Sequence, residues 1–456
     1  MASAAEQLMQ NFSFSSLGKA TELKNRIWFT LGALIVYRLG TYIPLPGIDP
    51  VTLKQIFASQ QGGILGMFDV FSGGALGRMT IFALNIMPYI SASIIMQLMT
   101  SVSPSLEAMK KEGEQGRKRI NQYTRYLTVL LAAVQGYGIA VGLEGAQNSL
   151  GSSPVIDAGM FFRATTVITL VGGTMFLMWL GEQITQRGVG NGISLIIFAG
   201  IVANLPLALA STLELGRTGA LSTIIIIGLL VMSVAVIAFI VFIERSQRRL
   251  LVQYPKRQHG NKMFGGDTSH LPLKLNTAGV IPPIFASSLL LMPATLAGFG
   301  AGADGGILAM VSAYLGRGQP AFLILYISMI VFFAFFYTAV VFNPEDTADN
   351  LKKNGGYIAG IRPGQNTAVY LDYILTRLTV LGAAYLSVVC VLPEILISQY
   401  AVPFYFGGTS LLIVVTVTID TITQIQGHLF AHQYEGLIKK SKIGRKGKKA
   451  KGGARS

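Results

Sequence analysis

Long stretches without a charged residue constrain the fold of this chain more than any other feature. Residues 79–106, 188–213, 218–243 and 275–303 each contain at least 26 consecutive residues without Asp, Glu, Lys or Arg. An α-helix needs about 20 apolar residues to cross the hydrocarbon core of a bilayer. Charged residues make up only 12% of the chain, against about 25% in soluble domains. The pattern therefore predicts an all-α integral membrane protein and excludes a soluble enzyme, a disordered chain and a fibrous protein.

Ten apolar stretches are long enough to be counted as transmembrane helices. The shortest has flanking Arg377, whose side chain can extend to the interface. The ten predicted spans are 26–43, 79–99, 122–142, 160–181, 191–212, 220–243, 276–296, 321–342, 373–392 and 405–426.

The lysines and arginines between these spans predict the orientation. Thirty of the 36 lie in the segments on the side that carries both termini, and six lie on the other side. Cytoplasmic loops carry the excess of positive charge, so we expect both termini in the cytoplasm. Residues 1–25 form a cytoplasmic segment without the charge order of a signal peptide, and 427–456 form a basic tail.

A weak internal repeat divides the ten spans into two groups of five. Residues 86–93 resemble 280–287, with Pro88 matching Pro282, and residues 192–197 resemble 408–413. Since five is odd, the second group must be inverted relative to the first. We therefore expect one half at 26–212, an external hinge at 213–219 and a second half at 220–426.

Inverted repeats usually have their functional site at the midplane, on irregular helices. Pro88, Pro282 and Pro283 are expected to interrupt spans 2 and 7. Two isoleucine pairs, Ile86 with Ile90 and Ile193 with Ile197, each share a helix face. They either pack against lipid and neighbouring helices or form an apolar constriction that closes by dewetting. No charged residue lies in the middle third of spans 2, 5, 7 and 10, which argues against an ion-coupled transporter.

A short apolar segment at 64–71 lies between spans 1 and 2. As a helix it measures only about 12 Å and cannot cross the bilayer. Glycines flank it on both sides, with Gly73 and Gly74 following it, so both ends can act as hinges. The segment either folds into a pore as a plug or lies on the membrane as an interfacial helix.

The cytoplasmic loops 244–275 and 343–372 are longer than topology requires, and the first is strongly basic, so they are candidates for a docking platform. The tail at 439–451 contains eight basic residues, which fit binding to ribosomal RNA, binding to anionic lipid, or a disordered topogenic tail.

The sequence contains no phosphate-binding G-x-x-x-x-G-K-[ST] motif. The single Cys390 permits no internal disulfide, and the His428 and His432 pair lacks further ligands, so no cofactor or metal is expected.

Ten motifs in order along residues 20–440 resemble the SecY/Sec61-alpha family of protein-conducting channels. They are Arg38–Gly47, Phe71–Ala75, Ile81–Ser93, Lys111–Glu114, Asn121–Arg125, Gly188–Ser194, Ala278–Pro282, Phe342–Pro344, Gly360–Gly364 and Gly407–Ile413. The resemblance implies an hourglass channel of two inverted five-helix halves around a central pore. Such a channel passes unfolded secretory polypeptides across the bacterial cytoplasmic membrane and releases transmembrane segments sideways into the bilayer. It is a passive channel and not an enzyme.

The resemblance also implies roles for particular residues. The pore ring maps onto Ile86, Ile90, Ile193, Ile197, Ile284 and Ile413. The plug maps onto 64–74, with Ile64, Leu65, Met67, Phe68, Phe71, Gly73 and Gly74. Ser91 and Gln97 face Met292 across a lateral gate between spans 2 and 3 and spans 7 and 8. Lys256, Arg257 and Arg362 lie on the docking surface for the SecA ATPase and the ribosome.

The resemblance implies two further partners, a SecE subunit that clamps the halves and a peripheral SecG subunit. Two other classes of function remain open from the residues alone. An inverted-repeat secondary transporter would bind a small solute saturably. A membrane-embedded enzyme would need converging ionisable groups at the midplane, and the sequence offers none.

Overall fold

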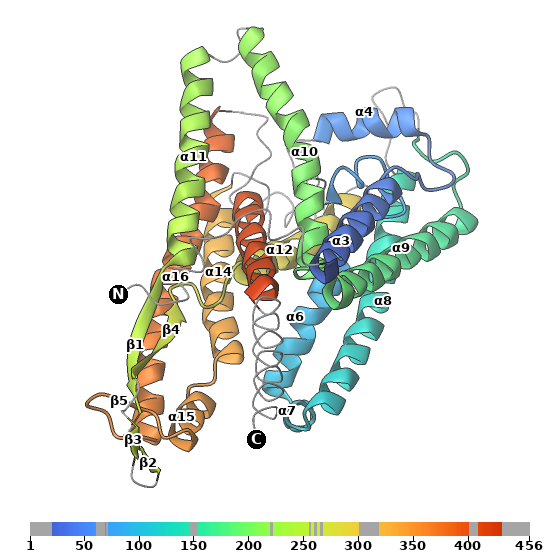
Figure 1. The fold of residues 1–456 in the computed structure, drawn as a ribbon. Helices are drawn as coiled ribbons and strands as arrows, with labels where there is room; N and C mark the ends of the chain where they lie inside the picture. Colours follow the sequence, from blue (N-terminus) through green and yellow to red (C-terminus); the bar gives the residue numbers. More distant parts are fainter. Residues whose placement is uncertain are drawn as a thin grey trace, which may run out of the picture.

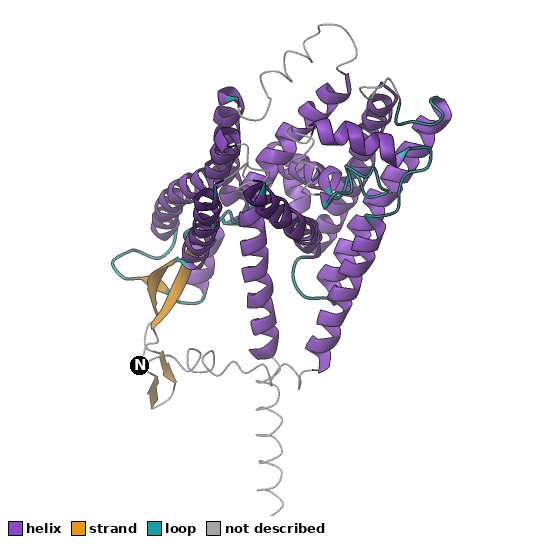
Figure 2. Ribbon diagram, turned by 90° about the horizontal axis from the view of Figure 1, so that it is seen from above, coloured by secondary structure: helices purple, strands orange, loops and turns teal. Residues whose placement is uncertain are grey.

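The computed structural model describes residues 21–60, 69, 72–145, 153–218, 222–254, 257–259, 262–264, 268–300, 319–400 and 409–430. Helices make up most of this part of the chain, and the strands are confined to one corner (Figure 2). The first group of helices comprises α3 (Thr21–Gly40), α4 (Pro50–Gln60), α6 (Met87–Val102), α7 (Pro104–Lys111), α8 (Glu114–Gly145), α9 (Met160–Arg187) and α10 (Gly192–Arg217). The second comprises α11 (Thr223–Arg245), α12 (Ile281–Gly300), α14 (Pro320–Val341), α15 (Pro344–Lys353), α16 (Gln365–Tyr400) and an unlabelled helix, Thr409–Phe430.

The expectation of an all-α membrane protein is confirmed. Within the described ranges, seven helices are long and apolar enough to cross a membrane: α8, α9, α10, α11, α14, α16 and Thr409–Phe430. The other three predicted spans overlap with α3, α6 and α12. In Figure 1, α3, α6, α8 and α9 lie on one side, α11, α14 and α16 lie on the other, and α12 lies between them.

The structure corrects the expected start of span 2. Residues 79–86 form turns rather than helix, and α6 begins at Met87. Met79 and Asn85 have φ values of 45° and 49°, a left-handed backbone that a right-handed helix cannot contain. Pro88 lies in the first turn of α6, and Pro282 and Pro283 lie in the first turn of α12. These prolines start their helices instead of interrupting them, because first-turn amides have no partner within the helix.

The irregular segment 72–86 is anchored to the chain that follows α3. The Leu45 amide donates to the Met79 carbonyl (2.9 Å), and the Ile81 amide donates to the Ile43 carbonyl (3.1 Å). Thr80 forms an isolated β-bridge with Pro44. These backbone bonds compensate for the missing helix, so that α6 can begin within the bundle.

Gly173 on α9 permits a close approach of this irregular segment. A Cβ atom at Gly173 would lie 2.0 Å from the Ile81 carbonyl oxygen, whereas a Cβ at Gly172 would have nothing within 4 Å. We expect Gly173→Ala to destabilise the protein by about 1–3 kcal/mol through overpacking. Gly172→Ala is the matched control and should stabilise by up to about 1 kcal/mol through helix propensity. The midpoints of thermal unfolding in detergent check this, and equal midpoints would contradict the packing.

The two long loops that are predicted to be cytoplasmic meet in one small sheet. Strands β1 (Gln247–Gln253) and β4 (Thr268–Lys274) form an antiparallel hairpin, and β5 (Tyr357–Ile358) pairs with the other edge of β1, giving the order β4-β1-β5. Strands β2 (Arg257–His259) and β3 (Lys262–Phe264) pair as a separate two-stranded ribbon. Figure 1 shows the strands at the same end of the bundle as α7 and α15.

Helix α16 is longer than the predicted span 373–392. Its 36 residues correspond to about 54 Å, well beyond the roughly 30 Å of a bilayer core. The first turns are amphipathic, and Leu371, Ile374 and Leu375 pack in one cluster with Leu250, Leu273 and Ile358 of the sheet. The sequence suggested a shorter helix because Asp372 and Arg377 interrupt the apolar run, whereas in the structure these turns continue the helix and cover the sheet.

Candidate pore constriction and lateral gate

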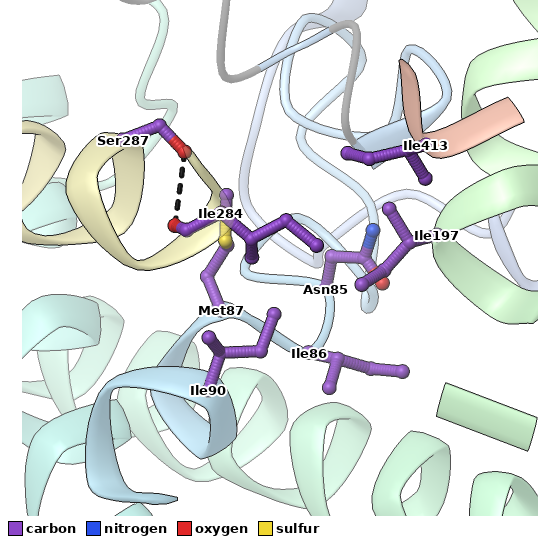
Figure 3. Close-up of a pocket in the computed structure, with 8 residues that line it drawn as sticks. All are labelled: Asn85, Ile86, Met87, Ile90, Ile197, Ile284, Ser287 and Ile413. Atoms are coloured by element: carbon purple, nitrogen blue, oxygen red, sulfur yellow. Dashed lines mark hydrogen bonds between the residues drawn. The ribbon is translucent and has the colours of Figure 1, made fainter. Parts of the chain in front are cut away.

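A small apolar pocket lies where the two groups of helices meet (Figure 3). Four separate parts of the chain supply its wall: α10, α12, helix Thr409–Phe430, and the first turn of α6 together with the two residues before it. We call this lining the collar. It consists of Asn85, Ile86, Met87, Ile90, Ile197, Ile284, Ser287 and Ile413. The structure thus brings together five of the six isoleucines of the expected ring.

The collar is closed. Ile86 and Ile413 are each only 1% exposed. The cavity measures about 10 Å³, at the lower limit of the roughly 10–15 Å³ that one water molecule needs. None of the eight lining side chains is charged. While these side chains stay in contact, an apolar pocket of this size has no room for a hydrated ion.

Ile193 is the ring residue that the structure does not place in this pocket. It lies in the first turn of α10, where it is half-buried against the main core. A Cβ at Gly181 of α9 would lie 3.2 Å from the Ile193 side chain. Ile193 therefore packs towards α9, one turn away from Ile197, although both residues share a helix face.

Local capping sets the position of α10. The Asn191 side chain accepts hydrogen bonds from the amides of Ile193 (3.1 Å) and Ser194 (3.5 Å). The Gly192 amide donates to the Thr185 hydroxyl at 2.9 Å. An asparagine N-cap satisfies amides that the helix leaves without partners. Asn191 thus fixes the start of the helix that brings Ile197 to the collar.

The expected gate residues lie on the two helices that meet beside the collar. Ser91 is buried on α6, and the half-buried Gln97 donates through Nε2 to the Ser93 hydroxyl at 3.4 Å. Met292 belongs to α12, but its side chain is outside the described part of the structure. No described contact joins Ser91 or Gln97 to Met292.

A different pair joins the two helices. The Ser288 hydroxyl of α12 donates to the Ile284 carbonyl at 2.7 Å, and its oxygen lies 3.6 Å from the Met87 sulfur of α6; both residues are buried. The sequence reasoning missed this pair. Met87 lies inside the first repeat window, and Ser288 directly follows the second. Extending the comparison of the two windows by one residue would have included both.

Only the end of the expected plug is described. Ile64, Leu65, Met67, Phe68 and Phe71 lie outside the described residues. Gly73 and Gly74 have φ values of 68° and 81°, which glycine adopts without strain. The Gly73 carbonyl accepts hydrogen bonds from Arg38 Nη1 (2.9 Å) and Arg78 Nη2 (3.0 Å). Two arginines therefore hold the chain where the expected plug ends.

The expected docking residues are described unevenly. Lys256 lies outside the described ranges, and Arg257 is described only as part of strand β2. Arg362 is exposed between β5 and α16, at the end of the bundle that carries the sheet. Its carbonyl accepts a hydrogen bond from the Thr367 hydroxyl at 3.1 Å. In the part of the chain that the structure describes, no group of three or more His, Cys, Asp or Glu residues could hold a metal ion.

Known proteins resemble this chain in sequence and in fold. The family model of SecY matches residues 80–422. The protein translocase subunit SecY of Rickettsia conorii is 59% identical over 434 residues, which cover 95% of this chain and 99% of the relative.

Two solved structures share the fold. The first is a SecY channel whose plug domain is described as stabilising the closed state and maintaining a membrane seal. Its TM-score is 0.64 at 18% identity, over 89% of this chain and 92% of that chain. The second is Sec61 in the canine ribosome–channel complex from the endoplasmic reticulum. Its TM-score is 0.59 at 18% identity, with the same coverage.

Proposed function

Because this chain belongs to the SecY family, we propose that it forms the protein-conducting channel of a Sec translocase. It passes unfolded secretory polypeptides across the membrane and releases transmembrane segments sideways into the bilayer. The single observation that carries the proposal is the collar, in which five isoleucines from four separate parts of the chain close an apolar pocket.

The chemistry of translocation explains why the collar is made of isoleucine. An unfolded chain exposes backbone polar groups that cannot enter lipid, so it needs an aqueous path through which ions must not leak. Isoleucine side chains offer no specific hydrogen bonds, so they can close around any sequence. They also exclude water when they touch.

Lateral release follows from partitioning at the gate. A leucine or isoleucine near the centre of a membrane helix gains a few tenths of a kcal/mol, and an arginine or aspartate costs about 3 kcal/mol. If α6 separates from α12, a segment in the pore can sample the bilayer. Apolar segments then leave, and polar ones continue through the collar. The Met87–Ser288 contact lies on this seam.

The plug assignment at 64–74 remains part of the proposal. Its support is the glycine pair at its end, held by Arg38 and Arg78. The similar fold of a SecY channel described as sealed by a plug domain adds to that support. The plug would close the pore from the external side, and 213–219 would form the hinge between the halves.

The partners follow from the same proposal. The sheet of β1, β4 and β5 would dock the SecA ATPase and the ribosome, with Lys256, Arg257 and Arg362 contributing positive charge. The similarity in fold to a ribosome-bound Sec61 supports this surface. SecE would clamp the two halves and SecG would bind peripherally. The basic loops and tail would contact ribosomal RNA.

The protein would lie in a bacterial cytoplasmic membrane with both termini in the cytoplasm. It would catalyse no reaction itself.

Reconstitution tests the proposal directly. We expect proteoliposomes that contain the chain with SecE and SecG to protect an added preprotein from external protease only when SecA and ATP are present. Liposomes with SecE and SecG alone are the control. Saturable uptake of a small solute without preprotein protection would instead favour the secondary transporter.

A further inference from the structure

Glu244 is a buried carboxylate at the end of α11. It is 9% exposed and lies one residue before the helix ends at Arg245. Its Oε1 accepts a hydrogen bond from the Asn276 side-chain amide at 2.7 Å. Among the described residues, no lysine or arginine forms an ion pair with Glu244. Burial of a carboxylate is costly unless the group is bonded, so the bond with Asn276 helps to compensate for that cost.

Asn276 lies in the short connection between the cytoplasmic sheet and α12. Strand β4 ends at Lys274, and α12 begins at Ile281. The Asn276 side-chain nitrogen donates a second hydrogen bond, to the Gly279 carbonyl at 3.0 Å. Gly279 has a φ of 64°, so the chain makes a left-handed turn directly before the helix. One side chain thus joins the turn that starts α12 to the end of α11.

Two further contacts fix the same connection. The Leu275 amide donates to the Ser246 carbonyl at 3.0 Å, beside the Glu244–Asn276 bond. A Cβ atom at Gly382 of α16 would lie 3.3 Å from the Leu275 carbonyl oxygen and 3.6 Å from the Asn276 Cα. Because Gly382 has no side chain, α16 can pack closely against this connection. The start of α12 is therefore held by both α11 and α16.

The first turns of α12 carry side chains of both the collar and the seam with α6. Ile284 and Ser287 line the collar (Figure 3), and the Ser288 hydroxyl oxygen lies 3.6 Å from the Met87 sulfur of α6. All three residues of α12 lie within nine positions of Gly279. A helix moves as a rigid element over so short a distance, so a shift of its start displaces these side chains as well.

We propose that Glu244 is a positioning residue, which acts through Asn276 to hold the start of α12 in the arrangement that closes the collar. The inference rests on the proposed function. In the closed channel the carboxylate and the amide stay in contact, and α12 stays against α6. Movement of α12 away from α6 breaks the bond, so the bond favours the closed state. Glu244 itself does not line the collar.

Two variants at position 276 isolate this contact. Asn276→Asp removes the donor and sets a second carboxylate against the first, which weakens the contact. In the double variant Asn276→Asp with Glu244→Gln, an amide again meets a carboxylate, with donor and acceptor exchanged. Both variants lack the donor to Gly279, so the difference between them reports the contact with residue 244 alone.

Resting ion conductance in planar bilayers, with SecE and SecG present, is the first measurement. We expect Asn276→Asp to raise it by about tenfold, the size expected for one buried hydrogen bond to a charged group. The double variant should return most of the way to the parent. Glu244→Gln alone keeps an acceptor for Asn276 in a weaker, neutral bond, so its leak should be only about twofold. Export of a preprotein with a defective signal sequence should rise and fall in parallel.

Glu144→Gln is the matched control. Glu144 of α8 is another largely buried carboxylate, and it pairs with Arg163 of α9 at 2.6 Å within the first group of helices. Its loss should lower the midpoint of thermal unfolding and leave conductance and export unchanged. A purely structural role for Glu244 predicts this same pattern for Asn276→Asp, a lower midpoint without a leak, and that result would overturn the proposal. A double variant that leaks as much as Asn276→Asp would also overturn it.

Failure of this inference is distinguishable from failure of the proposed function. If asparagine variants of the collar leak and neither Asn276→Asp nor Glu244→Gln does, the positioning role of Glu244 is refuted and the channel function stands. If the parent protein protects no preprotein, the channel function itself is refuted.

Discussion

Replacing both Ile284 and Ile413 by asparagine is expected to produce a channel that leaks ions at rest and exports preproteins with defective signal sequences. Both residues line the closed pocket. A buried amide without a partner costs about 1–3 kcal/mol, and hydration of the collar removes that cost. Two such amides shift the balance from the dry, closed state to the wet, open state by about tenfold or more. Bilayer conductance and the export of a signal-sequence mutant measure the two effects.

Ile193→Asn is the matched control, because Ile193 belongs to the expected ring but lies outside the pocket. It should raise the resting conductance much less than the double variant. Equal leaks from Ile193→Asn and from the collar variant would show that the pocket is not the constriction. Unchanged conductance and unchanged signal-sequence stringency in the double variant would refute the collar altogether.

A disulfide between Met87→Cys and Ser288→Cys is expected to abolish export and to restore it on reduction. The Met87 sulfur and the Ser288 hydroxyl oxygen are 3.6 Å apart on α6 and α12, so cysteines at these two positions face each other across the seam between the helices. A covalent bond there prevents the two helices from separating. Export of a preprotein before and after addition of a reductant gives the result, in a background with Cys390→Ala.

A second pair shows whether any cross-link would have the same effect. A Cβ atom at Gly136 of α8 would lie 3.7 Å from the Leu170 Cβ of α9, within the first group of helices, a separation that suits a disulfide. The disulfide between Gly136→Cys and Leu170→Cys should leave export unchanged, because opening of the gate does not separate α8 from α9. Normal export through the oxidised Met87–Ser288 pair would contradict the position of the gate.

The sequence predicted the helices well, because a span needs a long apolar run and nothing more specific. It predicted helix starts less well. The left-handed turns at Met79 and Asn85 depend on backbone bonds to residues 43–45, which no local pattern reveals. Pro88 was interpreted as an interruption because proline signals both a break and a first turn, and only the surrounding chain distinguishes the two.

The sequence also predicted some residues of the candidate site better than others. The repeat and the helical period identified Ile86, Ile90 and Ile197, because these residues share faces of matched helices. Ile284 and Ile413 coincide with Ile90 and Ile197 in the repeat, and their place in the ring came from the family resemblance. Ile193 satisfies the same period but packs towards α9, since a helix face is wider than the pocket. Asn85 and Ser288 were missed because the first reaches the pocket through a backbone turn and the second contacts Met87, a residue 201 positions away.

Cross-linking to a polypeptide stalled during translocation tests the central claim most directly. A preprotein with a tightly folded domain at its end stops in the channel, and a single cysteine in its unfolded part can then react with cysteines placed in this chain. We expect disulfides with Ile86→Cys, Ile284→Cys and Ile413→Cys, and none with Ile224→Cys, whose parent side chain is 80% exposed on the outside of α11. Bonds to Ile224→Cys with none at the collar would contradict a path through the centre of the molecule.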